Sequence, residues 1–376
     1  MRLGDFRPTL EMLRLIAEID EFKGSWRSLS NISPDRLATL KHVATVESIG
    51  SSTRIEGSTL SDAEVEMLLK RISKKSFQSR DEQEVAGYAD VIDNIFRNWQ
   101  QIPLSENHIK QLHRDLLKHS SKDDRHRGNY KSVQNNVEAF GPNGERLGVI
   151  FKTATPFDTP FRMTELIKWT DEKLQSNEIH PLLVITVFVA EFLAIHPFQD
   201  GNGRLSRALT TLLLLKKGYS YVPYSSMENV IEADKEGYYL ALRKTQSTLE
   251  LDEPIWDPWI LFFLRSVQKQ KTNLQSKISR EHLLEGELPE LSVRILDLVK
   301  QHGRLKISDL ETLTGESRST IKLRLNELIA RNMLTRNGSG PSTWYTMSRN
   351  DRYRAADISP SFLTSAQIRR WRNPLV

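Results

Sequence analysis

The chain has 376 residues, of which 38% are hydrophobic and 27% are charged, and its formal net charge is +5. This length predicts two or three domains with buried cores, and the absence of cysteine excludes disulfide scaffolds and thiolate metal sites. The first residues lack the apolar core of a signal peptide, and the longest apolar run is too short to span a bilayer. We therefore expect a cytoplasmic protein that does not contact membranes.

Residues 1–100 are predicted to form helices joined by polar loops. The segment at residues 52–57 has the sequence STRIEG. A Glu before a Gly is typical of an exposed helix end, so this segment indicates nothing specific on its own. The spacing of apolar residues places the helices at 10–22, 34–46, 61–72 and 82–99.

The central part of the chain combines an apolar helix with a polar loop. Residues 182–195 are apolar on nearly every side, which predicts a buried helix that Pro197 ends. After His196, Gly201 and Gly203 permit positive φ, so that backbone N–H groups can turn inward toward an anion. Residues 204–217 are predicted to form the next helix. Its N-terminus would face the loop, which predicts a nest for anionic oxygens.

The polar residues of this loop have complementary chemistry. Arg204 and Arg207 lie three positions apart on one helical face, where guanidinium groups suit phosphate oxygens. Asp200 is a single hard oxygen ligand, which fits Mg²⁺ held mainly by water and substrate phosphates. His196 is then the candidate general base. Each residue alone has an ordinary explanation as a helix cap or a loop, but together they predict a phosphate-handling active site.

Residues 196–207 match the pattern His-x-Phe-x-(Asp/Glu)-Gly-Asn-Gly-Arg-x-x-Arg at every defined position. This pattern is the signature of Fic-domain protein adenylyltransferases (AMPylators), which the chain therefore resembles. The resemblance implies a mainly α fold, with a Fic helical core and a β-hairpin flap. It also implies that the protein uses Mg²⁺ and moves AMP from ATP onto a Ser, Thr or Tyr hydroxyl of a protein, which can be the enzyme itself.

The resemblance assigns a role to each residue of the loop. His196 takes the proton from the target hydroxyl, and Asp200 holds the metal. The backbone of the glycine segment and the Asn side chain bind phosphates, and the two arginines hold the β- and γ-phosphates. These nucleotide-binding residues are Gly201, Asn202, Gly203, Arg204 and Arg207.

Two further segments extend the resemblance to the rest of the nucleotide site. Residues 128–137 resemble the strand of the flap, and the loop at 141–144 is predicted to turn into a second strand. The flap would pair with the target by its main chain. Its contributing residues are Asn135, Asn136, Val137 and Glu138. Tyr238 and Tyr239 either line the nucleoside pocket or are ordinary half-buried aromatics, and Gln246 falls near the adenine.

The STRIEG segment matches a second pattern, (Ser/Thr)-x-x-x-Glu-(Gly/Asn), which Fic proteins of the self-inhibited kind carry on an N-terminal helix. The match begins at Ser52 and places Glu56 at the acidic position. The resemblance implies that Glu56 pairs with Arg207 and fills the space of the ATP γ-phosphate. Nucleotide would then bind in a pose that is unfit for attack.

The basic excess of the chain is a C-terminal property. Lys and Arg outnumber Asp and Glu by 15 to 8 from residue 290 onward, whereas the counts are 38 and 40 before it. The residues after a polar helical linker resemble a winged helix, with helices at 291–299, 307–314 and 317–325 and a hairpin at 333–345. The predicted domains are an N-terminal helical region (1–100), a Fic catalytic domain (101–267), the linker (268–289), the winged helix (290–348) and a basic tail (349–376).

The C-terminal module leaves more than one function open. Its third helix would present polar side chains to DNA, although winged helices fused to enzymes also serve in dimerisation or protein docking. These side chains are Arg318, Ser319, Thr320, Lys322 and Arg324. The leading hypothesis is a self-inhibited adenylyltransferase with ATP and a protein as its substrates. The alternatives are a DNA-binding transcriptional regulator that senses nucleotide with little turnover, and removal of AMP by the same site.

Overall fold

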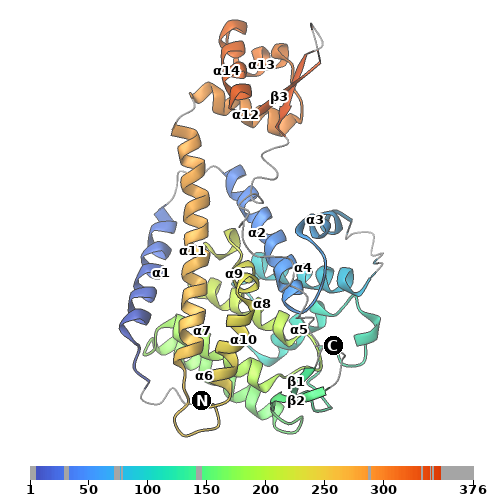
Figure 1. Ribbon diagram of the computed structural model, residues 1–376, viewed down its shortest axis with the longest axis vertical. Helices are drawn as coiled ribbons and strands as arrows, with labels where there is room; N and C mark the ends of the chain where they lie inside the picture. Colours follow the sequence, from blue (N-terminus) through green and yellow to red (C-terminus); the bar gives the residue numbers. More distant parts are fainter. Residues whose placement is uncertain are drawn as a thin grey trace, which may run out of the picture. The chain divides into compact units, whose positions relative to one another are not determined.

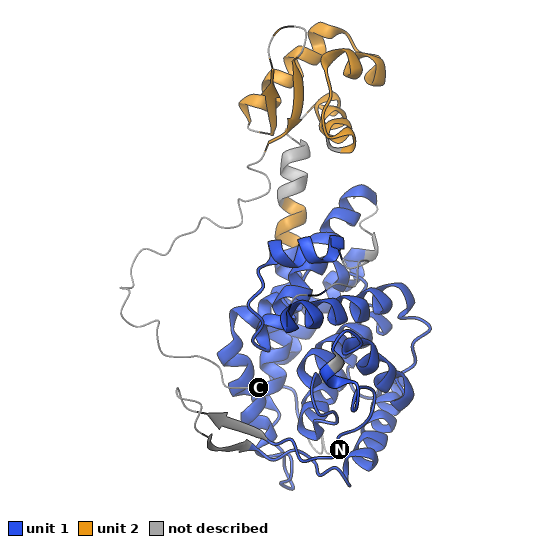
Figure 2. Ribbon diagram, turned by 90° about the vertical axis from the view of Figure 1, so that its right-hand side faces the viewer, with its two compact units in different colours: residues 1–274, 370–376 blue, residues 275–369 orange. Residues whose placement is uncertain are grey.

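The computed structural model describes residues 6–28, 34–71, 77, 79–140, 146–286, 289–331, 333–338, 340 and 343–348. These residues form a mainly helical protein with two small antiparallel sheets, which confirms the predicted fold class. They divide into two compact units, one that ends at Leu274 and one that begins at Gln275 (Figure 2). Within the described ranges, no helix is both long and apolar enough to cross a membrane.

The four helices predicted for the N-terminal region are present in the first unit. The second is longer than predicted, because it continues through a run of small residues that are poor helix formers. Ser48, Ser51 and Thr53 in this run are buried, and the helix packs against its neighbours there, so tertiary packing overrides local propensity. The STRIEG segment therefore begins inside a helix. The four helices are α1 (Leu10–Ser28), α2 (Pro34–Ile55), α3 (Asp62–Arg71) and α4 (Arg80–Asn98).

Two buried helices, α7 (Pro181–Ile195) and α8 (Asn202–Lys216), form the centre of the first unit (Figure 1). The first has Pro181 in its opening turn, where the missing N–H costs nothing, and it is apolar on nearly all sides as predicted. Trp259 donates a hydrogen bond to the Thr186 carbonyl at 2.8 Å, which joins this helix to α11. The helices of this region are α5 (Glu106–Leu116), α6 (Thr159–Ser176), α7 (Pro181–Ile195), α8 (Asn202–Lys216), α9 (Met227–Ala233), α10 (Lys235–Gln246) and α11 (Asp257–Gly286), with short 3-10 turns η2 (Ser121–Asp123) and η3 (Val222–Tyr224).

A two-stranded sheet precedes α6. Strands β1 (Val137–Phe140) and β2 (Arg146–Phe151) are antiparallel, with Val137 opposite Phe151 and Glu138 opposite Val149. The register shifts between Val137 and Glu138 and again between Ala139 and Phe140, so the strand pairing is irregular. The hairpin predicted here is therefore present, and its turn at 141–144 lies outside the described residues.

Beyond the end of α11, the described residues of the second unit form three helices and a hairpin in the order predicted. Their apolar side chains form one core, which includes Ile295, Leu310, Ile321 and Leu325. A bridge between Leu305 and Tyr345 joins the hairpin to the segment before the second helix. The elements are α12 (Glu290–His302), α13 (Ile307–Thr314), α14 (Arg318–Ala330), β3 (Leu334–Asn337) and β4 (Trp344–Met347). Assignment of this unit as a winged helix stays an interpretation, and the predicted tail at 349–376 lies outside the described residues.

The polar side chains of α14 are largely engaged within the second unit. Arg318 pairs with Glu311 at 3.0 Å, and Arg324 pairs with Glu327 at 2.9 Å. The hydroxyls of Ser319 and Thr320 both contact that of Ser317, the N-cap of the helix. Among the described residues, Lys322 is the basic side chain of this set without an ion-pair partner.

Candidate active site

The loop between α7 and α8 is fixed by its own backbone geometry. His196 caps α7 with a φ of 52°, a left-handed conformation that is uncommon for a residue with a side chain. Gly201 has a φ of 78° and begins α8. The Asn202 amide accepts from the Phe198 N–H at 2.9 Å and donates to the Phe198 carbonyl at 2.7 Å. The side chain of Asn202 thus closes the loop, and its predicted contact with nucleotide stays a prediction.

His196 is placed to act as a neutral base. Its Nδ1 lies 3.3 Å from the Leu193 carbonyl, which can only accept, so a hydrogen bond there places the proton on Nδ1. Nε2 then carries the free lone pair. Burial, and next the nearby Lys131 ammonium, lower the pKa of His196 to about 4. The imidazole is therefore deprotonated at neutral pH.

A second histidine supports the loop from α5. The ring of His113 stacks on Phe198 with centroids 3.8 Å apart. Its Nδ1 accepts from the Gly128 N–H at 2.8 Å, so its Nε2 donates to the Asp200 carbonyl at 2.9 Å. Burial lowers the pKa of His113 to about 4, which keeps this tautomer neutral. The sequence gave no sign of this role for His113.

The base of the hairpin is joined to the same loop by side chains. Lys131 donates to the Asn135 side chain at 2.7 Å, to Thr153 at 2.9 Å and to the Ile195 carbonyl at 2.9 Å. Burial, followed by repulsion from Arg162, lowers the pKa of Lys131 to about 7.

The four predicted flap residues divide between side-chain and main-chain contacts. Asn135 was expected to contribute mainly backbone, but its amide donates to the carbonyls of Phe198 at 2.7 Å and His196 at 3.3 Å. Asn136 also uses its side chain, which accepts from the Thr153 N–H at 3.2 Å. Val137 and Glu138 lie in β1, as a main-chain role requires.

Arg207 is held by the end of α2. Its guanidinium donates to the Ser52 hydroxyl at 2.9 Å, to the Ser52 carbonyl at 2.9 Å and to Glu56 Oε1 at 2.8 Å. The Arg207 side chain is 4% exposed. Burial opposes its charge, but Glu56 outweighs this and the pKa of Arg207 lies above its usual value. The predicted pairing of Glu56 with Arg207 is thus present in the geometry.

Two features bring Glu56 to this position. Arg54, on the same helical turn, forms a bidentate pair with Glu232 at 2.6 and 2.9 Å, which fixes the end of α2 on α9. Gly203 leaves the space that the carboxylate fills, because a Cβ there would lie 2.1 Å from Glu56 Oε1. Gly203 of the loop and Glu56 at the end of α2 are therefore close neighbours.

Arg204 forms a second charge cluster beside the first. Its guanidinium is 2% exposed and pairs with Glu84 at 3.0 Å and with Asp200 at 3.4 Å. Asp200 also accepts from the Gly201 N–H at 2.6 Å and from Arg80 at 3.0 Å. Burial opposes ionisation of Asp200, but Arg204, Gly201 and Arg80 together lower its pKa. The sequence did not indicate Arg80 or Glu84.

The predicted adenine-side residues lie largely in the core. Tyr238 is buried and makes edge contacts with Trp259 and Phe262, which favours its alternative role as a core aromatic. Gln246 is also buried, and Tyr239 contacts Tyr238 with ring centroids 5.1 Å apart.

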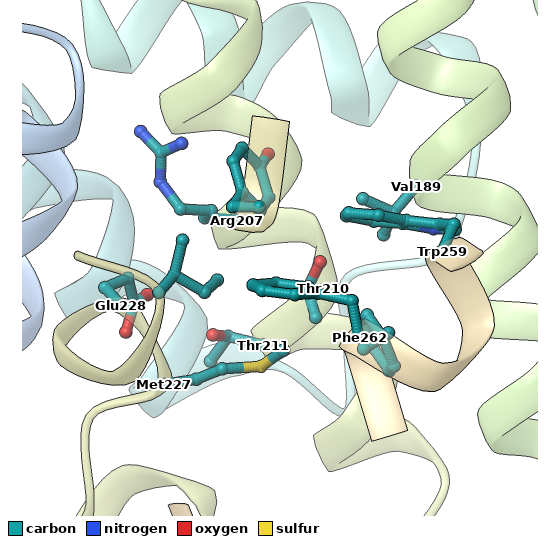
Figure 3. Close-up of a pocket in the computed structure, with 11 residues that line it drawn as sticks. Val189, Arg207, Thr210, Thr211, Met227, Glu228, Trp259 and Phe262 are labelled. Atoms are coloured by element: carbon teal, nitrogen blue, oxygen red, sulfur yellow. The ribbon is translucent and has the colours of Figure 1, made fainter. Parts of the chain in front are cut away.

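A small cavity lies behind Arg207. Its volume is about 20 Å³, enough for a single water molecule and far too small for a nucleoside. Figure 3 shows Arg207 at one end of this cavity, with its guanidinium turned away from Trp259 and Phe262 at the other end. Tyr238 also lines the cavity. The cavity therefore belongs to the packing around Arg207, and it supplies no nucleoside pocket.

Comparisons with known proteins identify the central part of the chain. Residues 103–214 match the model of the Fic/DOC family. The protein adenylyltransferase Fic of Drosophila grimshawi is 29% identical over 220 residues, which cover 58% of this chain and 42% of that protein. The Drosophila melanogaster protein of the same name gives the same identity and coverage. The chain thus spans less than half the length of these curated relatives.

Solved structures show the same fold. A Fic family protein from Desulfovibrio desulfuricans G20 aligns over 93% of this chain and 99% of its own, with a TM-score of 0.63 and 22% identity. Fic-1 from C. elegans aligns over 72% of this chain and 73% of its own, with a TM-score of 0.56 and 15% identity. Residues 103–214 thus match the Fic/DOC family, as the sequence predicts, and the solved structures support the fold.

Proposed function

We propose that this Fic-domain chain is a protein adenylyltransferase that transfers AMP from ATP onto a Ser, Thr or Tyr hydroxyl and that Glu56 holds it in a self-inhibited state. The observation that carries this proposal is the Arg207 guanidinium, which is buried and bound by Glu56 directly beside the His196 loop. The curated relatives named protein adenylyltransferase Fic support the same activity.

The chemical step needs a base and a leaving group. Nε2 of His196 takes the proton of the target hydroxyl, whose oxygen then forms a bond to the α-phosphorus of ATP. The bond from that phosphorus to the bridging oxygen breaks, and pyrophosphate leaves with the electron pair. The low pKa of His196 supports this role, because the imidazole needs no prior deprotonation at neutral pH.

The arginines supply the charge that the polyphosphate requires. Nη1 of Arg207 and Nε of Arg204 are buried without hydrogen-bond partners among the described residues, so each retains a donor for a phosphate oxygen. The Gly201 N–H already donates to Asp200, but the N–H groups of Asn202 and Gly203 in the first turn of α8 add a second set of donors. Phosphoryl-type transfer relies chiefly on such positioning and charge stabilisation.

Asp200 is the residue that fits Mg²⁺. Guanidinium groups of Arg80 and Arg204 already lie on its carboxylate, so the position accepts a cation. No cluster of three or more His, Asp or Glu ligands occurs in the described part of the chain, so the ion would need phosphate oxygens to complete its shell. When bound, Mg²⁺ neutralises charge on the phosphates. Asp200 would orient the polyphosphate through it.

Self-inhibition follows from the position of the Glu56 carboxylate on the Arg207 guanidinium. A carboxylate that accepts from Arg207 resembles a phosphate oxygen in charge and geometry. A γ-phosphate that binds Arg207 must displace it. We also propose the division of labour predicted from the sequence, in which residues 1–100 carry the inhibitory segment, 101–267 catalyse, 268–289 link, and 290–348 with the tail bind a further partner.

Intact-mass measurement tests this function. The Glu56→Gly variant, incubated with ATP and Mg²⁺, should gain the mass of one or more AMP groups on the protein, and the wild type should gain far less. Omission of ATP is the control. No added mass on the variant, in the presence of folded protein, would exclude auto-modification and contradict the proposed activity.

A further inference from the structure

Arg80 pairs with the Asp200 carboxylate although it lies far from the His196 loop in sequence. Two other contacts of this carboxylate, from the Gly201 amide and from Arg204, belong to the loop and α8 themselves. Arg80 instead is the first residue of α4, and its Nη2 lies 3.0 Å from Asp200 Oδ2. It therefore brings a positive charge from the N-terminal region to the proposed metal ligand.

Four side chains form a closed ring of alternating charge at this place. Arg80 pairs with Glu84 at 2.8 Å, Glu84 with Arg204 at 3.0 Å, and Arg204 with Asp200 at 3.4 Å. The contact between Arg80 and Asp200 completes the ring. Its formal charges sum to zero, so Asp200 is neutralised without any ion.

Arg80 is the member of this ring that can leave. Its side chain is 43% exposed, whereas that of Arg204 is 2% exposed. An Arg at the first position of a helix also faces the positive end of the helix dipole, so its place depends on the carboxylates around it. Glu84, one turn along α4, would keep it close after it leaves Asp200.

A divalent ion and Arg80 require the same oxygen. A metal held by Asp200 would crowd the oxygen that now accepts from Arg80, and the two positive charges would repel each other at such close range. Without metal, in contrast, Arg80 shields the approaching triphosphate from the negative charge of Asp200. We propose that Arg80 is an internal counter-ion of Asp200, which competes with the metal and gives way when metal and nucleotide bind together.

This inference rests on the proposed function, and it concerns a control separate from Glu56. Glu56 blocks the γ-phosphate position at Arg207. Arg80 would set the metal concentration at which Asp200 becomes available. Loss of Arg80 should therefore weaken ATP binding without metal and strengthen it with metal, so both effects raise the benefit of Mg²⁺.

Calorimetric titration gives the dissociation constant of ATP in Mg²⁺ and in EDTA. The benefit of Mg²⁺ is the ratio of the constant in EDTA to the constant in Mg²⁺. The full chain with Glu56→Gly and His196→Ala is the parent, because it can bind nucleotide without turnover. We expect Arg80→Ala to raise the ratio about two- to fivefold, the range of a partly exposed ion pair. Chelation of Mg²⁺ by free ATP is the same for every variant and cancels in the comparison.

Two further variants make the outcome decisive. Arg97→Ala removes an arginine of the same helix that likewise pairs with a carboxylate one turn away, and it should leave the ratio unchanged. Asp200→Asn should reduce the ratio and abolish the effect of Arg80→Ala. If Arg80→Ala leaves the ratio at the parent value while Asp200→Asn lowers it, the inference about Arg80 is wrong and the proposed function stands. A parent that binds no ATP, or a ratio insensitive to Asp200→Asn, overturns the metal role of Asp200 and the inference with it.

Discussion

The charged residues of the His196 loop and those of α14 differ in how they are held. Arg204 and Arg207 are almost fully buried, and their carboxylate partners include Glu84 and Glu56, which lie more than a hundred residues away in sequence. Arg318 and Arg324 are 58% and 26% exposed, and each pairs with a residue of its own small unit. Removal of one partner from a buried ion pair strongly destabilises the fold, whereas exposed ion pairs contribute little to stability. This difference favours the first unit as the place of the proposed activity.

The largest effect is expected from the base. In the Glu56→Gly background, His196→Ala should reduce transfer of label from α-labelled ATP to protein by about 10²- to 10⁴-fold, because it removes the proposed general base. Replacement of the neighbouring ring, His113→Ala, should also weaken activity, but through disorder of the loop that it supports. Thermal unfolding should reveal that loss in His113→Ala and not in His196→Ala. Label that persists without His196 would contradict its role.

Removal of the inhibitory carboxylate should give the next largest change. Glu56→Gly frees Arg207 from one charge-assisted hydrogen bond, and we expect auto-modification to rise by about 10- to 150-fold. The matched control is Glu311→Gly, which removes the partner of exposed Arg318 and should not alter the rate. Equal rates for wild type and Glu56→Gly would refute self-inhibition.

Ser52 should have a smaller influence of the same sign. Its hydroxyl accepts one hydrogen bond from Arg207, while its carbonyl keeps another, so Ser52→Ala loosens the inhibited arrangement only in part. We expect activation by about two- to tenfold in the labelling assay. Thr53→Val is the control, because Thr53 is buried on the same helix and its hydroxyl donates to the Ile49 and Gly50 carbonyls of that helix. A Ser52→Ala variant as slow as the control would leave Glu56 as the sole restraint.

The burial of His196 predicts an unusual pH dependence. The protonated fraction of a histidine rises as pH falls through its pKa, and burial places that point at about 4. The kcat/KM of Glu56→Gly should therefore stay nearly constant from about pH 7.5 to about pH 5.5, whereas a base with an ordinary pKa near 6.5 would lose about nine-tenths. An acid limb centred near the ordinary histidine value would show that His196 is solvated in the working enzyme.

Charge removal on α14 should matter least. Lys322→Ala and Arg318→Ala should each change AMP transfer by less than about twofold, because these side chains are exposed and remote in the chain from the loop. Fluorescence anisotropy with duplex DNA provides the complementary measurement. Salt-sensitive binding that Lys322→Ala weakens, in a protein that transfers no AMP, would favour the alternative of a DNA-binding regulator.

The sequence was most informative where the site is local. His196, Asp200, Gly201 and Arg204 lie within a few residues of one another, and the helices on both sides follow from apolar spacing and glycine conformation. Their spatial grouping could be predicted because the loop itself brings them together. Glu56 was different, since only a resemblance to known proteins linked it to Arg207 across the chain.

Contacts that depend on tertiary packing gave no sequence signal. Arg80 meets Asp200 only because α4 packs against α8, and Lys131 reaches the Ile195 carbonyl because its side chain is buried at the end of α7. The end of α2 was placed too early for the same reason, because small buried residues are poor helix formers unless neighbours pack on them. Asn135 was expected to act mainly through its main chain, but its side chain also donates a hydrogen bond to the Phe198 carbonyl.

Competition between Glu56 and the γ-phosphate is the central claim, and the affinities of ATP and ADP measure it directly. Calorimetry on His196→Ala and on His196→Ala with Glu56→Gly avoids turnover in both proteins. With Glu56 present, ATP and ADP should bind within about twofold of each other, and without it ATP should bind about 10- to 150-fold more tightly than ADP. The same ratio of ATP to ADP affinity in both proteins would show that Glu56 does not occupy the γ-phosphate position.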